Sequence, residues 1–223
     1  TGAGPAELAA AAQRADYDPP EALLAVVLPE SHVRPAQGRL DPRTLHPTDD
    51  VPGLAEEDAV LLAPVAGPTG RPRVLRALAG VPCVVGPARP FAASRDSFRR
   101  ALRARLLLLA DSGPVDTEEH LPELVVGADP DALADLRARA LAPLARARPA
   151  TVARLEETLR AWLLHHGRRD EVAAELFVHA QTVRYRMGQL RELYGEALDD
   201  PRTVLELTVA LGTRGALGAA MPQ

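Results

Sequence analysis

The sequence contains no lysine: all 26 of its basic residues are arginines. A phosphate-loop NTPase needs the lysine of its loop, and a Schiff-base enzyme needs a lysine amine, so both classes of enzyme are excluded. A single cysteine, Cys83, excludes an internal disulfide and a cysteine-rich zinc site. Aromatic residues make up only 3% of the chain, so leucine, valine and alanine must fill its core.

Long hydrophobic runs and a strong net charge are absent as well. Apolar runs such as Leu106–Ala110 fall far short of the ~20 residues that a membrane span needs. No basic stretch followed by an apolar one opens the chain, so we expect no secretory signal, no membrane partner and a reducing, cytoplasmic setting. Because the first residue is Thr1 rather than Met, we expect a processed chain or a piece of a longer one. The net charge of −4 gives no global attraction to nucleic acid, so any DNA contact must be local.

The 223 residues are 47% hydrophobic and 25% charged, which is typical of a globular protein. Apolar runs rich in β-formers at 22–28, 59–65 and 81–85 are predicted strands, and helical patterns alternate with them. We therefore predict an α+β fold, in which a small α/β domain precedes an all-α helix-turn-helix domain. The expected parts are a helical segment at 1–20, the α/β domain at 21–115, a helical connector at 116–148, the helix-turn-helix domain at 149–215 and a tail at 216–223.

Three sequence patterns in the middle of the chain predict the starts of helices. Ser94 is expected to cap a helix whose apolar stripe is Phe98, Leu102, Leu106 and Leu109. Two further helices are expected to start at residues 116–117, an Asp-Thr pair, and at residues 129–130, an Asp-Pro pair.

Charge is unevenly distributed along this part of the chain. Residues 71–105 carry nine arginines against one acid, and residues 106–136 carry eight acids and no arginine. These are either two solvated faces, or two segments that dock on each other or across a dimer.

A short helix at about 170–176, a three-residue turn and a longer helix at about 180–194 form a candidate helix-turn-helix. The expected core of this motif is Val172, Ala173, Leu176, Val178, Val183, Met187 and Leu190. At 100° per residue, the last three of these share one side of the longer helix, and a polar side points away. The expected DNA-binding residues are Gln181, Thr182, Arg184, Tyr185, Arg186 and Gln189.

These residue types suit a major groove. Arginine can bond guanine bidentately, glutamine can bond adenine, and a threonine methyl can pack on thymine. Arg186 lies closer to the core side, so we expect it to contact phosphate or an internal acid rather than a base. Gly188 costs about 1 kcal/mol of helix stability relative to alanine, and close approach of the duplex is one possible compensation.

The stretch Arg154–Leu211 resembles the carboxy-terminal helix-turn-helix domain of the PucR (CdaR-like) family of bacterial transcriptional regulators. The residues that carry the resemblance include the run LFVHAQTVRYRM at 176–187, a Trp-Leu pair at 162–163 and the Leu-Asp-Asp-Pro sequence at 198–201. The resemblance implies operator DNA as partner, a structural role for His179, and a degenerate GGDEF-like domain before the DNA-binding domain. The metal and nucleotide chemistry of an active cyclase is not implied, because the sequence has no Gly-Gly-Asp/Glu-Glu-Phe loop.

We therefore expect a cytoplasmic, sequence-specific transcriptional regulator that is not an enzyme and has no catalytic residue, metal or cofactor. Its expected partners are double-stranded operator DNA, a second copy of itself and a small-molecule effector. The alternative is a nucleotide- or metabolite-binding α/β protein whose helix-turn-helix serves protein interaction. The adjacent carboxylates considered for such a domain are Asp49-Asp50. We expect His165 and His166 to be surface or helix-end residues, and Trp162 and Cys83 to belong to the core.

Overall fold

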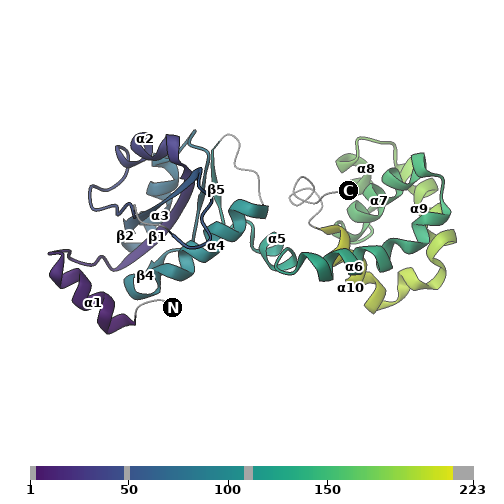
Figure 1. The fold of residues 1–223 in the computed structure, drawn as a ribbon. Coiled ribbons are helices and arrows are strands. Elements are labelled where there is room, and N and C mark those ends of the chain that lie inside the picture. Colours follow the sequence, from purple (N-terminus) through teal and green to yellow (C-terminus); the bar gives the residue numbers. More distant parts are fainter. Residues whose placement is uncertain (1–3, 48–50, 108–112, 213–223) are drawn as a thin grey trace. The chain divides into compact units, whose positions relative to one another are not determined.

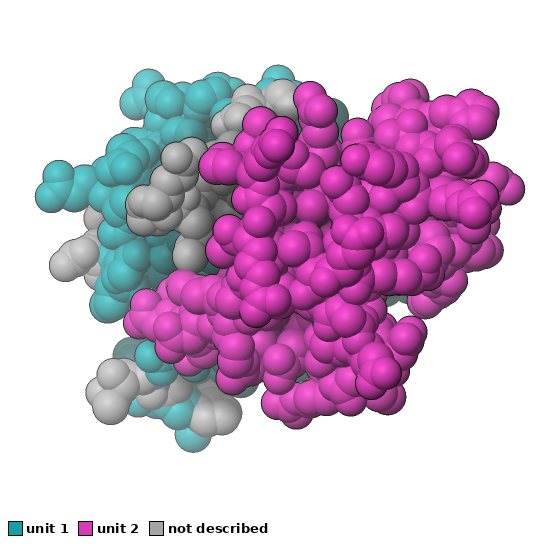
Figure 2. All heavy atoms as spheres, turned by 90° about the vertical axis from the view of Figure 1, so that its right-hand side faces the viewer, with its two compact units in different colours: residues 1–124, 222–223 teal, residues 125–221 magenta. Residues whose placement is uncertain are grey.

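The computed structural model describes residues 4–47, 51–107 and 113–212 (Figure 1). The chain divides into two compact units, residues 1–124 and residues 125–221, which are coloured separately in Figure 2. The first unit is built on a mixed sheet and the second is helical, which confirms the predicted α+β class. Asp49, Asp50, Leu109 and the tail at 216–223 lie outside the described residues.

Within those described ranges, no helix is both long enough and apolar enough to cross a membrane.

Strands and helices alternate in the first unit. Its elements are α1 (Pro5–Arg14), β1 (Ala22–Pro29), a 3-10 turn (Glu30–His32), α2 (Val33–Gln37), β2 (Asp58–Val65), α3 (Gly67–Ala77), β3 (Cys83–Val85), β4 (Arg89–Pro90), a 3-10 turn (Phe91–Ala93), α4 (Ser94–Leu107), β5 (Pro114–Asp116) and α5 (Leu121–Val126), which reaches the boundary of the second unit. The three strands predicted from apolar runs are therefore present. The helical pattern between the second and third of these strands is α3, which begins at Gly67 and ends at Ala77.

The centre of the sheet is β1, whose residues 23–28 are all fully buried. The strand order is β2-β1-β3-β5, with β4 also paired to β1. Val26 lies opposite Leu61 of β2 and Val85 of β3, both in antiparallel register. Alternate side chains of β1 pack with α2 and α3 in one hydrophobic core, and α4 packs against β1 and β3. Successive side chains of a strand point to opposite faces of the sheet. Because helices cover both faces of β1, all of its central residues are apolar.

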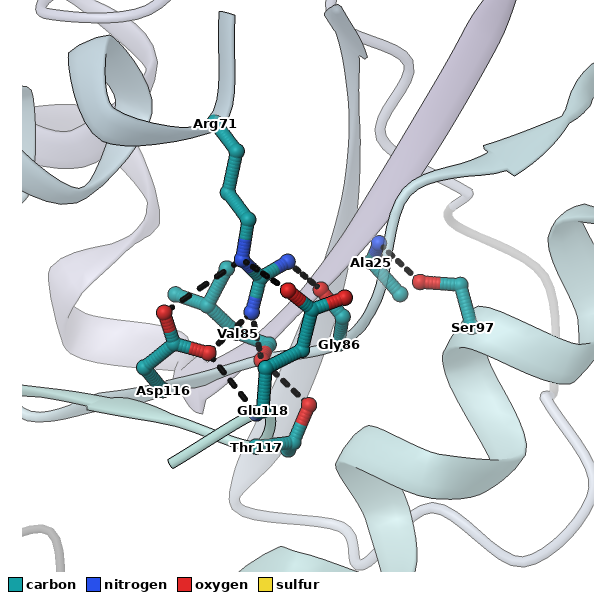
Figure 3. Close-up of polar contacts among 8 residues, drawn as sticks. All are labelled: Ala25, Arg71, Val85, Gly86, Ser97, Asp116, Thr117 and Glu118. Carbon is teal, nitrogen blue, oxygen red and sulfur yellow. Dashed lines mark hydrogen bonds and ion pairs between the residues drawn. The ribbon is translucent and has the colours of Figure 1, made fainter. Parts of the chain in front are cut away.

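Helix α4 uses a different face from the one that its hydrophobic residues predict. Its buried residues are Ser97, Ala101 and Ala104, whereas Leu106 of the expected stripe is 73% exposed. Phe98 and Leu102 are half-buried. The Ser97 hydroxyl accepts a hydrogen bond from the Ala25 amide of β1 at 2.8 Å (Figure 3). Small side chains therefore let the helix approach the sheet closely, and the leucines lie beside the contact.

The helix start expected at residues 116–117 is wrong. Asp116 ends strand β5, which pairs in parallel with β3, and the next helix begins at Leu121. Thr117 is fully buried and its hydroxyl donates to the Val85 carbonyl at 2.9 Å. An Asp-Thr pair is common at helix starts because both side chains accept from free backbone amides, but here strand pairing takes precedence.

One arginine of the basic segment joins α3 to the edge of the sheet (Figure 3). The Arg71 guanidinium bonds the Asp116 carboxylate and the backbone carbonyls of Val85 and Gly86, and its Nε lies 3.4 Å from Glu118. The side chains of Arg71 and Asp116 are each only 13% exposed. The basic and acidic segments therefore do dock on each other at this point, within the unit.

The second unit is helical throughout its described residues. Its elements are α6 (Pro130–Leu141), a 3-10 turn (Ala142–Arg146), α7 (Pro149–Leu164), α8 (Arg169–Glu175), α9 (Ala180–Tyr194), a 3-10 turn (Gly195–Asp199) and α10 (Pro201–Gly212). Asp129 caps α6 as expected: its carboxylate accepts from the Ala132 amide at 2.9 Å. One hydrophobic core joins α6, α7, α8, α9 and α10.

Candidate nucleic-acid interface

Helices α8 and α9 are joined by a tight turn at residues 176–179. The Val178 amide donates to the Ala173 carbonyl at 3.0 Å and the Phe177 amide donates to the Ala174 carbonyl at 3.3 Å. This is the hydrogen-bond pattern of a Schellman motif, which ends a helix and reverses the chain. It requires a left-handed residue at position 177, where Phe177 has φ 52° in place of the usual glycine. The backbone hydrogen bonds therefore set the geometry of the turn, and Phe177 adopts the left-handed conformation despite its bulky side chain.

The first turn of α9 is capped by a histidine. His179 is the N-cap residue, and its Nδ1 accepts from the Gln181 amide at 3.1 Å. The His179 carbonyl also accepts from the Thr182 amide at 2.8 Å. A cap satisfies an amide that would otherwise have no partner within the helix, so this imidazole fixes where α9 begins. His179 thus has the structural role expected for it.

The expected core residues of the motif face the interior of the helical unit. Val172, Val183 and Leu190 are completely buried, and Ala173 and Met187 are 8% and 3% exposed. Leu176 and Val178 are half-buried and pack against the same core. The core is completed from α7 and α10 by Leu155, Leu159, Leu207 and Leu211, which are all buried. The side of α9 that faces the core therefore packs against α7 and α8, in a core that α10 shares.

The opposite side of α9 is polar and open. Gln181, Arg184 and Tyr185 are exposed, and Thr182 and Gln189 are half-buried. A shallow hollow of about 490 Å³ lies over this side, lined by Gln181, Arg184, Tyr185, Gly188, Gln189 and Glu192. Within the described residues, no hydrogen bond or ion pair joins Arg184 to the rest of the chain, so its guanidinium is available to a ligand.

Arg186 has a protein partner that the sequence did not predict. It is half-buried, and its Nη1 donates to the Thr158 hydroxyl of α7 at 3.2 Å. Thr158 is fully buried and donates in turn to the Arg154 carbonyl at 2.8 Å. Its observed partner is therefore a hydroxyl rather than an acid, and the contact ties α9 to α7.

Two residues of this surface were missed in the sequence analysis. Glu192 lines the hollow, and helical spacing could have placed it there because it lies four residues after Gly188. Phe177 is 96% exposed at the turn, and nothing in its local sequence distinguishes it from a core phenylalanine. The hollow therefore has one cation, Arg184, and one carboxylate, Glu192, and a carboxylate can accept a hydrogen bond from the amino group of cytosine.

His165 ends α7 and links it to α8. Its Nδ1 lies 3.0 Å from Glu171, and its Nε2 lies 2.5 Å from Glu175. The hydrogen bond to Glu175, followed by that to Glu171, raises the pKa of this imidazole above its usual value. Arg160 and Arg168 pair with the same two carboxylates at 3.0 and 2.9 Å. His165 is thus the helix-end residue expected, and it connects the helix before the motif to the motif itself.

The described residues include no group of three or more His, Cys, Asp or Glu side chains placed to hold a metal ion. Cys83 is fully buried, and burial raises the pKa of its thiol to about 12, so the thiol stays protonated. Trp162 is half-buried against the helical core, with the Arg191 guanidinium 6.0 Å from its ring centre.

Comparison with known proteins identifies the same region. Residues 155–212 match the family model described as the PucR C-terminal helix-turn-helix domain. An uncharacterized protein of Mycobacterium tuberculosis (strain H37Rv) is 34% identical over 153 residues, which cover 67% of this chain and 36% of that protein. The Purine catabolism regulatory protein of Bacillus subtilis (strain 168) is 42% identical over 57 residues, 26% of this chain and 11% of that protein. The chain thus spans about a third of the length of the mycobacterial relative.

A solved structure, a regulator of polyketide synthase expression from Bifidobacterium adolescentis, is similar over 93% of this chain and 90% of that chain, with a TM-score of 0.39 and 22% identity. The family match, by contrast, coincides with the helices described above: it begins inside α7 and ends with α10. The chain therefore carries a PucR-type C-terminal helix-turn-helix domain at residues 155–212.

Proposed function

We propose that this protein is a transcriptional regulator that binds operator DNA with the polar side of α9. The observation that carries the proposal is that Arg184 is exposed and has no hydrogen-bond or ion-pair partner among the described residues, on a helix whose other side is buried in a core. The match of residues 155–212 to the PucR C-terminal helix-turn-helix domain and the likeness to the Bacillus regulatory protein support it. Gln181, Thr182, Tyr185 and Gln189 lie on the same side and would supply the remaining base or phosphate contacts.

The proposal includes a homodimer. One helix-turn-helix whose outward hollow is lined by one arginine, Arg184, offers few contacts, and a twofold-symmetric pair on two half-sites doubles them. We assign dimerisation or effector response to the amino-terminal unit, interpreted as a degenerate GGDEF-like domain. Its mixed sheet and covering helices are compatible with that interpretation.

The experiment is binding-site selection from genomic fragments, followed by fluorescence anisotropy on the selected operator and on scrambled DNA. Arg184→Ala is expected to reduce the discrimination between the two by about 1–3 kcal/mol, the worth of one bidentate base contact. Arg202→Ala is the matched control, because Arg202 is exposed on α10 and pairs with Glu206 at 2.9 Å. Equal discrimination in both variants would reject the role of Arg184.

Arg186 needs a separate measurement because it contacts Thr158. A phosphate contact predicts that Arg186→Ala weakens binding to all sequences alike and lowers the salt slope by about one. An anchoring contact predicts an unchanged slope and a less stable domain, by about 1 kcal/mol. Salt titration combined with thermal unfolding separates the two. Failure of any DNA to bind in a salt-dependent manner would favour the alternative, a helix-turn-helix that serves protein interaction.

A further inference from the structure

The amino-terminal unit has a hollow of about 490 Å³ between β1, β2, α3 and the loop that follows α2. Its wall is formed where β1 begins and β2 ends, by residues 20–21 and 64–66, together with residues 39–43 and one side of α3. A volume of this order is within the range of small-molecule sites, which is roughly 300–1,000 Å³. All of its lining residues belong to the amino-terminal unit, so the site is formed by that unit alone.

Three arginines and two acids line the hollow, a net charge of +1. Asp41 is already engaged by Arg43, whose Nε and Nη2 donate to its two carboxylate oxygens at 3.2 Å each. Arg39 donates to the Ala79 carbonyl at 3.2 Å and has further donors to offer. Arg73 is exposed, and within the described parts of the chain it makes no hydrogen bond or ion pair. The charge of Arg73 also helps to lower the pKa of Asp41, after the larger effect of Arg43, and Glu21 is the second acid of the lining. Cationic donors therefore remain available in the hollow after the protein's own hydrogen bonds and ion pairs are counted.

Apart from Thr69, the other side chains of the wall are apolar. Val65 and Val74 are 7% and 8% exposed, and Leu40 packs against the same core cluster as these two valines. Prolines at positions 20, 42 and 64 extend this lining. An apolar wall beside the exposed Arg73 guanidinium matches a ligand that has an anionic end and an apolar body.

We propose that this hollow binds a small organic anion, a carboxylate or phosphate carried on a compact apolar body, and that Arg73 is its main anion-binding residue. The site would be the effector site of the proposed regulator, and only this assignment of purpose rests on the proposed function. Arginine is suited to both anions because its planar donors match carboxylate and phosphate oxygens.

Isothermal titration calorimetry of the whole chain, without DNA, tests the proposal with four probes. Benzoate and phenyl phosphate combine an anion with a ring, inorganic phosphate is the anion alone, and benzyl alcohol is the ring without a charge. At least one of the first two is expected to bind saturably, and at least tenfold more tightly than inorganic phosphate or benzyl alcohol. The advantage over inorganic phosphate follows from burial of one aromatic ring, and the advantage over benzyl alcohol follows from a charge-assisted hydrogen bond. No saturable binding by benzoate or phenyl phosphate, or equal binding by benzyl alcohol, would overturn the inference.

The variant that locates the site is Arg73→Ala, matched with Arg76→Ala. Both arginines are exposed on α3 and both variants remove one positive charge, but only Arg73 lines the hollow. Arg73→Ala is expected to weaken the tighter probe by about fivefold to tenfold, and Arg76→Ala by less than twofold. Equal effects of the two variants would mean that the probe senses only the overall charge, and would refute the assignment.

The result is independent of DNA binding. A chain that binds the probe through Arg73 but binds no DNA keeps this inference and refutes the proposed function. A chain that binds its operator but none of the probes does the reverse.

Discussion

Removal of the Arg71 guanidinium is expected to destabilise the amino-terminal unit strongly. Arg71→Met keeps most of the aliphatic stem and removes the charge and all of its hydrogen bonds. Arg71 and Asp116 form an ion pair in which each side chain is only 13% exposed, and it joins α3 to the ends of β3 and β5. Water cannot readily replace the guanidinium at such a site, because both partners are largely covered.

The structure allows the magnitude to be worked out group by group. Without Arg71, Asp116 keeps the hydrogen bond from the Glu118 amide at 2.8 Å but loses its cation. The Val85 carbonyl keeps the Thr117 hydroxyl at 2.9 Å, whereas the Gly86 carbonyl loses the guanidinium. Loss of one partner of a buried ion pair costs roughly 3–5 kcal/mol, and the residual exposure places this pair at the lower end, at about 3 kcal/mol.

Asp116→Asn is expected to cost less, about 1–2 kcal/mol, because the amide still accepts a hydrogen bond and Arg71 keeps its carbonyl partners. The double variant should be less destabilised than the sum of the two single variants by at least about 1 kcal/mol, since the two residues contact each other.

Urea unfolding followed by far-ultraviolet circular dichroism measures these differences. The chain has one tryptophan, Trp162, which lies in the carboxy-terminal unit. Its fluorescence transition therefore reports on the unit that Arg71 does not belong to, and we expect that transition to stay where it is. If Arg71→Met lowers the free energy of unfolding of the amino-terminal unit by less than about 1 kcal/mol, or if the two substitutions are additive, the reasoning is wrong.

Three further predictions concern single positions. Glu175 and Glu171 raise the pKa of His165, so the stabilising effect of the charged imidazole is present below about pH 6.5 and is lost as the pH rises through the raised pKa. His165→Gln should therefore lower the melting temperature more at pH 6 than at pH 8.5. A difference in melting temperature that does not depend on pH would contradict this. Gly188→Ala should raise the free energy of unfolding by about 1 kcal/mol, because an added Cβ meets nothing within 4 Å. If the duplex approaches α9 at this position, the same variant should weaken operator binding in anisotropy measurements. A variant that is less stable than the original chain would contradict the stability prediction. Gly86→Ala should destabilise by more than about 1 kcal/mol in thermal unfolding, because its Cβ would lie 2.5 Å from the Ser97 carbonyl oxygen, whereas Gly113→Ala meets nothing and should be neutral.

The helical unit could be predicted from the sequence in most of its detail, because its limits are set by local chemistry. The Asp-Pro pairs at 129–130 and 200–201 mark the starts of α6 and α10, and α9 has the bounds expected for it. The spacing of Val183, Met187 and Leu190 indicates one buried side, and that side is the one the structure buries. A helix that packs through large apolar residues shows its buried face in its sequence.

The sheet unit was harder to predict because its contacts are not local. Residues 116–117 carry a helix-start signal, but pairing with β3 makes Asp116 the end of a strand. That pairing joins strands 31 residues apart, from Val85 to Asp116, and no local pattern reports it. The same strand pairing places Asp116 beside Arg71. The charge pattern of the sequence therefore suggests an interaction between the basic and acidic segments, but it does not identify the residues that make the interaction.

Helix α4 shows why hydrophobicity alone does not identify a buried face. The hydrophobic effect, which grows with the apolar area buried, favours packing α4 on the sheet through its leucines. Close packing of helix and sheet instead favours the side of α4 that has the smallest side chains. The Gly86 position allows that approach, because any side chain there would collide with the Ser97 backbone. Once the helix is that close, the Ser97 hydroxyl can bond the Ala25 amide, and Leu106 is left exposed. The same limit applies to Arg186 in α9: its angle on the helix indicates a half-buried position, but its partner is set by Thr158, a residue of another helix. The direction of a side chain can therefore be derived from its own helix, whereas its partner depends on which helices pack together.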